Sequence, residues 1–179
     1  MNENRKSREI GVVLGSTSDI DKVSSLFSIL DEFEVGYEVA IISAHRTPHL
    51  LRKYAKDASS RGVKVIIAAA GLSAALPGAL AAELDLPVIG LPISAPPLNG
   101  VEALLAIAQM PPGVPVASVG IDSGKNAALL ALRILALYRP ELYERLARYR
   151  ENLARDVLEK AGLLRDKGLP VWVPEKEET

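Results

Sequence analysis

The chain has 179 residues, 49% of them hydrophobic, which is enough apolar material for the core of one domain. Its 21 basic and 22 acidic side chains nearly cancel, which excludes a global field that would draw the protein to nucleic acid or to an anionic membrane surface. Cysteine is absent, which excludes disulfides, thiolate nucleophiles and cysteine-ligated metal sites.

The first ten residues are polar and lack the apolar stretch of a secretory signal, so we expect a cytoplasmic protein. Glycine and proline repeatedly interrupt the most apolar region, residues 63–107. No segment reaches the roughly 20 uninterrupted apolar residues of a membrane-spanning helix.

Short apolar segments alternate with longer segments of helical period through residue 137, and this alternation predicts five strand–helix units. The expected strands are 10–14, 37–42, 63–68, 87–91 and 116–120, and the expected helices are 20–30, 48–61, 74–83, 101–109 and 125–137. Runs such as VKVIIAAA are apolar at consecutive positions, as in strands that are buried on both faces of a parallel sheet. We therefore predict an α/β fold with three layers: a doubly wound, five-stranded parallel sheet in flavodoxin-like order 2-1-3-4-5.

Beyond Pro140 the pattern predicts a longer amphipathic helix, whose apolar positions are Leu142, Leu146, Tyr149, Leu153 and Val157. Its stripe needs a partner surface, either the domain's own core or a neighbouring subunit, and the segment around Trp172 can dock in the same way. We expect a single domain over 1–179, with a flexible N-terminus (1–8), a sheet domain (9–138) and a helix and tail that form an oligomer (139–179).

In such a fold the ligand site lies at the carboxyl ends of the strands. The first strand ends in GSTSD, residues 15–19, where hydroxyls and free amides meet at a helix N-terminus and form a seat for phosphate. The alternative is that Ser18 or Asp19 merely caps the helix. Because a carboxylate is a poor phosphate ligand, Asp19 is better suited to accept hydrogen bonds from ribose hydroxyls.

The second strand ends in SAHRTP, residues 43–48, beside the first loop. Arg46 offers a fork of donors that suits phosphate, and histidine has an ordinary pKa of about 6.5 that suits proton transfer near neutrality. A lone histidine is more often structural, but the strand-end position favours a catalytic role for His45. His49, in the next helix, is expected to be exposed or capping.

Two further loops complete the expected crevice. The small residues 70–78 after the third strand either let a flat ligand approach the backbone or let a helix pack closely on the sheet. After the fourth strand, residues 94–100 contain a proline pair that stiffens either a wall of the crevice or a simple turn.

The motifs GSTSD, SAHRTP and the small-residue loop ending in LPG, followed by LNGVEALLAIAQMPPGVPVASVGID, resemble the N5-carboxyaminoimidazole ribonucleotide mutase family of purine biosynthesis. The resemblance covers residues 10–137. It implies conversion of N5-carboxyaminoimidazole ribonucleotide to its C4-carboxylated isomer through trapped carbon dioxide, with His45 shuttling protons. No metal, nucleotide or biotin cofactor is implied.

The resemblance also implies partners and a binding set. A homo-octamer locked by the carboxyl-terminal helix is expected, with possible hand-off of substrate from an ATP-dependent synthetase. The catalytic residue is His45, there is no metal ligand, and the implied substrate-binding residues are Ser16, Ser18, Asp19, Ser43, Ala44, Arg46, Gly71, Leu72, Ser73, Ala74, Ala75 and Leu76.

One position departs from the mutase pattern, because Ala75 stands where such mutases usually carry a second histidine. In that detail the loop resembles the related carboxylases that use free carbon dioxide and aminoimidazole ribonucleotide, whereas the remaining motifs favour the mutases. Two readings of other kinds stay open. One is a flavodoxin-like protein that binds a flavin or a sugar phosphate without catalysis, although an aromatic content of only 4% disfavours a flavin. The other is a degenerate, inactive member of the family.

Overall fold

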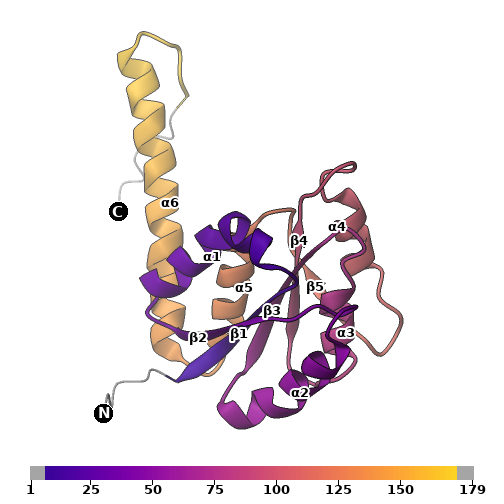
Figure 1. The fold of residues 1–179 in the computed structure, drawn as a ribbon. Coiled ribbons are helices and arrows are strands. Elements are labelled where there is room, and N and C mark those ends of the chain that lie inside the picture. The colour runs from indigo at the N-terminus through magenta and orange to yellow at the C-terminus, as the bar shows by residue number, and fades with distance from the viewer. Residues whose placement is uncertain (1–6, 173–179) are drawn as a thin grey trace.

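The computed structural model describes residues 7–172 and contains one five-stranded sheet in the order β2-β1-β3-β4-β5 (Figure 1). All neighbouring strands are parallel. The strands are β1 (Arg8–Leu14), β2 (Gly36–Ile41), β3 (Val65–Gly71), β4 (Val88–Ile93) and β5 (Ala117–Ser118). This arrangement confirms the predicted flavodoxin-like doubly wound sheet.

Six α-helices and two short 3-10 helices, η1 and η2, connect or follow the strands in the described part of the chain. They are η1 (Thr17–Asp19), α1 (Ile20–Glu32), α2 (Pro48–Ala58), η2 (Ser59–Arg61), α3 (Ala75–Ala81), α4 (Val101–Ala108), α5 (Gly124–Leu135) and α6 (Pro140–Asp166). Each predicted helix is present. Pro48 occupies the first turn of α2, as its fixed φ angle favours.

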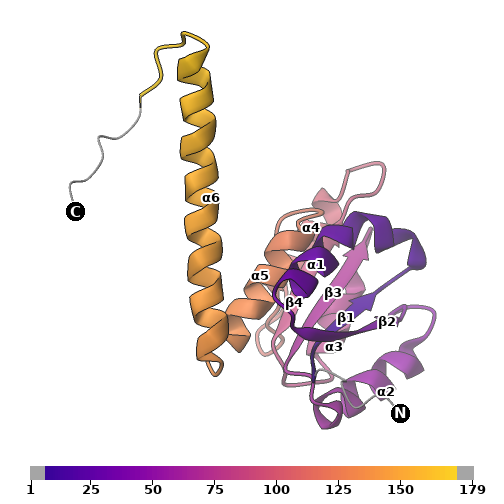
Figure 2. The ribbon, with the colours of Figure 1, turned by 90° about the vertical axis from the view of Figure 1, so that its left-hand side faces the viewer.

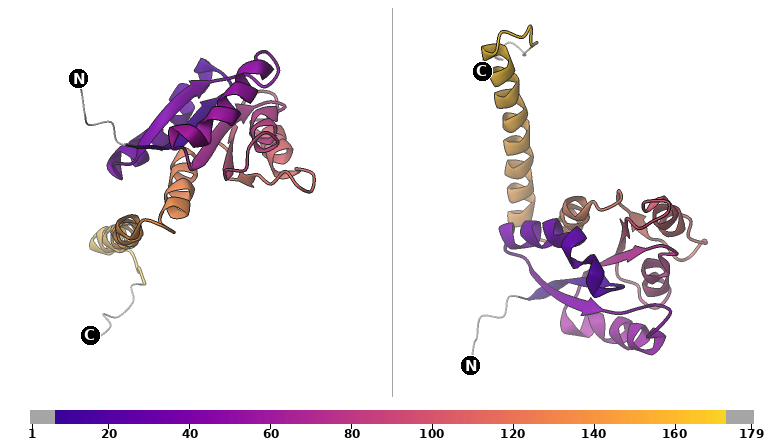
Figure 3. Two further views of the ribbon diagram at one scale, coloured as in Figure 1. Left: turned by 90° about the horizontal axis from the view of Figure 1, so that it is seen from below. Right: turned by 45° about the horizontal axis from the view of Figure 1, so that its top comes forward.

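Two cores lie on opposite faces of the sheet, because successive side chains of a strand point to opposite sides. Ile10, Val12 and Leu14 of β1 pack with α1, α5 and the first part of α6. Val13, between them, packs on the other side with α2, α3 and α4. The two helical layers are visible on either side of the strands (Figures 1 and 3).

The bounds of all five strands differ by one to three residues from the predicted ones, and the differences at β3 and β5 have a clear physical reason. The apolar run at 63–68 predicts a strand from Val63, but Val63 donates its N–H to Ala58 O at the end of the preceding helical segment. The strand β3 instead continues through small residues to Gly71. The predicted strand 116–120 is reduced to two residues, so β5 is much shorter than its neighbour β4.

Only the first part of α6 packs on the sheet domain. Leu142 and Leu146 are buried, and the Tyr149 ring lies 5.6 Å from that of Phe33. Farther along, Val157 is 65% exposed, and the helix stands clear of the domain (Figures 2 and 3). The apolar stripe of α6 thus packs on the core of the sheet domain in its first turns. Beyond these turns it has no partner within residues 7–172.

Trp172, the last described residue, is 82% exposed. The part of this segment after Trp172 lies outside the described residues, as do residues 1–6 of the expected N-terminal tail. Among residues 7–172, no helix combines the length and the apolar character that crossing a membrane requires.

A cluster of charged side chains joins β2 to η2. Glu38, whose side chain is 11% exposed, accepts hydrogen bonds from Arg61 Nη2 at 2.7 Å and Nε at 3.2 Å. The hydrogen bonds from Arg61 hold the pKa of Glu38 below its ordinary value of 4.5. The Arg61 guanidinium also lies 4.8 Å above the Tyr54 ring.

Because the folded-state pKa of Glu38 is depressed, its contribution to stability is present above pH 4.5 and is lost as the pH falls through the folded value. We expect Glu38→Gln to lower the free energy of unfolding at pH 7 by about 1 kcal/mol. The difference from the unmodified protein should shrink below about pH 4. Urea unfolding at pH 7 and below about pH 4 measures the free energy of unfolding of both proteins, and the exposed Glu144→Gln variant is the control. An equal loss of stability at the two pH values would contradict the prediction.

Candidate active site

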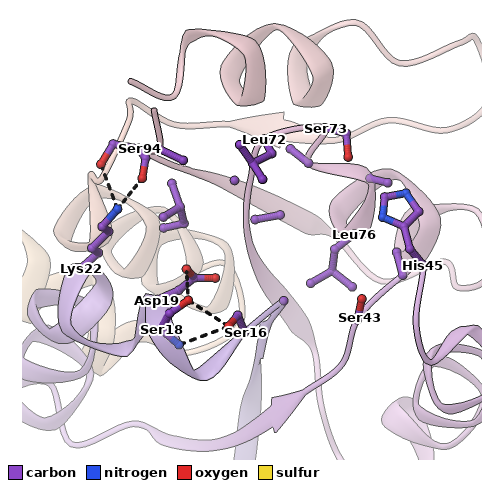
Figure 4. A pocket seen from close by; sticks show the side chains of 18 of the residues that line it. Ser16, Ser18, Asp19, Lys22, Ser43, His45, Leu72, Ser73, Leu76 and Ser94 are labelled. Atoms are coloured by element: carbon purple, nitrogen blue, oxygen red, sulfur yellow. Dashed lines mark hydrogen bonds between the residues drawn. The ribbon is translucent and has the colours of Figure 1, made fainter. Parts of the chain in front are cut away.

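A cavity of about 520 Å³ opens at the carboxyl edge of the sheet, where the loops after β1, β2, β3 and β4 converge. This volume is in the usual range for small-molecule sites. Every residue that the sequence analysis assigned to the site lines it (Figure 4). The further lining residues are Gly15, Lys22, Ala70, Ile93, Ser94, Ala95 and Pro96.

The loop after β1 places three polar side chains together at the start of α1. Ser16 Oγ accepts the Ser18 N–H at 3.2 Å, and the Ser18 hydroxyl lies 2.9 Å from Ser16 Oγ and 3.3 Å from Asp19 Oδ1 (Figure 4). Ser16 is therefore the cap of η1. These hydroxyls lie at the N-terminus of a helix, where partial positive charge favours an anion.

The capping alternative for this loop is wrong for Asp19. Asp19 occupies the N-cap position of α1, but its side chain makes no capping hydrogen bond. The hydroxyl of Ser18 likewise contacts neighbouring side chains of the loop. The Asp19 carboxylate therefore stays at the cavity lining, where it can accept hydrogen bonds.

The loop after β2 is closed by Thr47. The Thr47 hydroxyl accepts the Ser43 N–H at 3.0 Å and lies 3.1 Å from Ser43 O, which also accepts the Thr47 N–H at 2.9 Å. Ser43 Oγ accepts the N–H of Arg46 at 3.2 Å and its Nε–H at 3.4 Å. These contacts fix a tight turn whose three middle residues are Ala44, His45 and Arg46.

His45 and Arg46 are both exposed at this turn. The His45 ring lies on the same side of the cavity as Ser73 and Leu76 (Figure 4). Arg46 forms no salt bridge within residues 7–172, so part of its guanidinium fork is available to an anion. His49 is exposed in the first turn of α2, as predicted.

The small-residue loop combines close backbone packing with a place in the cavity lining, and the approach of a flat ligand to it stays a prediction. A side chain at Gly71 would place its Cβ 3.0 Å from Ile93 O, so this residue allows β3 and β4 to approach. Ala74 and Leu76 are buried while also bordering the cavity. Leu72 and Ala74 adopt positive φ angles of 55° and 41°, a conformation that costs non-glycine residues about 1–3 kcal/mol and often marks functional loops.

The loop after β4 forms a wall of the cavity, which is one of the two alternatives predicted for it. Ser94, Ala95 and Pro96 line the cavity, and these three residues are called the wall segment below. Lys22 of α1 was not predicted, yet it lines the same side and donates to Ser94 O and to Ser94 Oγ, the latter at 3.3 Å. Its position one helical turn after Asp19 is a sequence signal that could have found it.

A second hollow of about 350 Å³ adjoins the cavity and shares Gly15, Ser16, Ser43 and Arg46 with it. Arg46 therefore lies between two open spaces at the helix N-terminus.

Within residues 7–172, no group of three or more histidine, aspartate or glutamate side chains gathers in a way that could hold a metal ion.

The fold and the cavity define a flavodoxin-like α/β protein whose ligand site is built from four strand-end loops. The model of the AIR carboxylase family matches residues 9–156, and the chain belongs to this family.

Named relatives and solved structures agree with this membership. The chain is 54% identical over 147 residues to the N5-carboxyaminoimidazole ribonucleotide mutase of Pyrococcus abyssi, covering 82% of this chain and 84% of that one. It is 48% identical over 163 residues to the phosphoribosylaminoimidazole carboxylase of Schizosaccharomyces pombe, covering 91% of this chain and 30% of that protein. The crystal structure of Treponema denticola PurE superposes with a TM-score of 0.79 at 30% identity, covering 87% of this chain and 97% of that one.

Proposed function

We propose that the protein is an N5-carboxyaminoimidazole ribonucleotide mutase of purine biosynthesis, which moves a carboxyl group from the exocyclic nitrogen of its substrate to C4 of the imidazole ring. The observation that carries the proposal is the convergence of His45, Arg46, Ser16, Ser18 and Asp19 on one cavity. The relative from Pyrococcus abyssi bears the name of this activity.

Binding of the ribonucleotide follows from the charges of the lining. The phosphate lies against Arg46 and the hydroxyls of Ser16, Ser18 and Ser43, near the N-terminus of α1. The Asp19 carboxylate accepts hydrogen bonds from the ribose hydroxyls. The imidazole ring then extends toward the loop Gly71–Leu76, whose small side chains let a flat ring approach the backbone.

The reaction proceeds in two half-steps that balance in protons. In the first, the bond between the exocyclic nitrogen and the carboxyl carbon breaks, carbon dioxide is released, and His45 gives a proton to the nitrogen. In the second, C4 of the ring attacks the carbon dioxide, and His45 recovers a proton from C4. Carbon dioxide that is held in the cavity stays beside its acceptor, and such proximity replaces a bimolecular encounter by an effectively intramolecular one.

A direct carboxylase that takes aminoimidazole ribonucleotide and free carbon dioxide is the second candidate. Ala75, at the start of α3, offers the cavity a methyl group and no second titratable side chain. The relative from Schizosaccharomyces pombe is named a carboxylase. The remaining motifs, from SAHRTP to the stretch after Pro97, favour the mutase.

The exposed part of α6 supports assembly into a homo-octamer, in which Leu153, Val157 and Leu158 contact neighbouring subunits. Light scattering of the purified chain measures the assembly mass, and a monomer would contradict this part of the proposal. We also place the protein in the cytoplasm, where an ATP-dependent synthetase would hand over the substrate.

A non-catalytic protein that binds a flavin is disfavoured by the cavity itself. None of the residues that line it is phenylalanine, tyrosine or tryptophan, so no large aromatic ring is present to stack on an isoalloxazine. A purified protein that carries yellow colour and no turnover would reverse this choice.

The test is formation of the C4-carboxylated ribonucleotide from N5-carboxyaminoimidazole ribonucleotide by the purified protein, without ATP. Turnover above the rate of spontaneous decarboxylation supports the proposal. Spontaneous rates with both the protein and its heat-denatured control would contradict it.

A further inference from the structure

The strand β4 extends past its outer neighbour in the sheet. Pairing with β5 joins Ile89 to Ala117 and Gly90 to Ser118, and one more hydrogen bond runs from Val119 N to Gly90 O at 3.2 Å. The strand β4 nevertheless continues to Ile93 and leads directly into the wall segment. Its outer edge therefore needs other partners at the point where the cavity begins.

Asp122 supplies those partners. Its backbone N–H donates to Pro92 O at 2.9 Å, and its Oδ1 accepts the Ser94 N–H at 2.9 Å. The backbone N–H and C=O groups of successive strand residues point to opposite edges. Residues 90, 92 and 94 therefore present their backbone groups to the same edge. A single residue thus replaces the missing length of β5, with one bond from its backbone and one from its side chain.

The conformation of Asp122 makes this double contact possible. Its φ angle is 53°, in the left-handed region that aspartate and asparagine tolerate better than most residues. It lies in the turn before α5, where Ser123 N donates to Gly120 O at 3.1 Å and Gly124 N donates to Asp122 O at 2.9 Å. The turn is therefore held independently of the carboxylate.

Ser94 is held from the opposite side by Lys22. The Lys22 ammonium donates to Ser94 O and lies 3.3 Å from Ser94 Oγ (Figure 4). The N–H of Ser94 is thus fixed by Asp122 and its carbonyl by Lys22. Ala95 and Pro96, which line the cavity, follow directly and take their position from this anchored residue.

We propose that Asp122 is a positioning residue for substrate binding, which acts through Ser94 and holds the wall segment against the cavity. Its effect on substrate affinity rests on the proposed mutase function. The carboxylate is a charge-assisted acceptor, which is stronger than a neutral one, and without it the Ser94 N–H lacks the contact that it makes here.

The test uses Asp122→Gly, Asp122→Ala and Asp122→Asn in the full chain. Glycine adopts the left-handed conformation without strain, so Asp122→Gly removes the carboxylate while keeping the turn foldable. Asparagine keeps an acceptor oxygen and tolerates the conformation. Lys125→Ala, an exposed position at the start of α5, is the matched control.

Hydrogen exchange of residues 93–99 in the ligand-free protein is the readout that does not depend on activity. We expect exchange about tenfold faster in Asp122→Gly and Asp122→Ala, and rates within about twofold of the unmodified protein in Asp122→Asn and Lys125→Ala. Unchanged exchange in Asp122→Gly overturns the proposal, whether or not the protein proves to be a mutase.

Steady-state kinetics then separates positioning from general destabilisation. We expect the KM of Asp122→Gly to rise about tenfold with kcat within about threefold, and Asp122→Asn to restore the KM. A fall in kcat alone with unchanged KM, or equal defects in the glycine and asparagine variants, overturns the positioning role. Absence of turnover in the unmodified protein contradicts the mutase function. Hydrogen exchange then decides alone whether Asp122 holds the wall segment.

Discussion

Replacement of His45 by asparagine is expected to lower kcat about a thousandfold while nucleotide affinity stays within about threefold of the unmodified protein. The side chain is assigned to the two proton transfers, whereas affinity is assigned to Arg46 and the serine hydroxyls. Asparagine keeps a polar side chain of similar size but cannot exchange a proton near neutral pH. Calorimetric titration with the product and single-turnover kinetics measure the two quantities separately.

The chain offers a matched control in its other histidine. His49 is exposed in the first turn of α2, outside the residues that line the cavity. His49→Asn should retain kcat and KM within about twofold, since it leaves the turn 43–47 unchanged. Substantial turnover in His45→Asn, or a large loss of nucleotide binding, would contradict the assignment of His45 to proton transfer.

Replacement of Arg46 by alanine is expected to weaken nucleotide binding about 30-fold or more, because charge-assisted hydrogen bonds to a phosphate are lost. The guanidinium bonds Ser43 Oγ and has no acidic partner within residues 7–172, so its remaining donors face the open space at the helix N-terminus. Lysine should restore only part of the affinity, since it lacks the planar fork.

The decisive comparison for Arg46 uses two ligands. Affinity for aminoimidazole ribonucleotide should fall in Arg46→Ala, whereas affinity for the corresponding nucleoside without phosphate should be unchanged. Exposed Arg52 on α2 provides the control variant Arg52→Ala, which should bind both ligands normally. Equal losses for both ligands would remove Arg46 from the phosphate contact.

The sheet and most of the cavity could be predicted from the sequence because both depend on local patterns. Continuous apolar strands separated by helical periods allow few arrangements, and the parallel order brings the ends of β1 and β2 together. The GSTSD and SAHRTP loops had to meet once that order was right. The position of His45 follows from the strand end, not from any property of histidine itself.

The features that were missed depend on contacts between distant segments. Lys22 reaches Ser94, 72 positions away, and Asp122 reaches it from 28 positions in the other direction. No pattern in the sequence marks either of these two contacts. The apolar run 116–120 predicts a full strand, but a strand forms only where its neighbour pairs with it, and Asp122 takes over that pairing after two residues.

The mutase function is tested most directly by offering the purified protein two different starting materials. One is freshly made N5-carboxyaminoimidazole ribonucleotide without bicarbonate, and the other is aminoimidazole ribonucleotide with excess carbon dioxide. We predict efficient formation of the C4-carboxylated product from the first at substrate concentrations where the second is converted only slowly. Efficient turnover from the second at modest carbon dioxide, with none from the first, would contradict the mutase and identify Ala75 as the mark of a direct carboxylase.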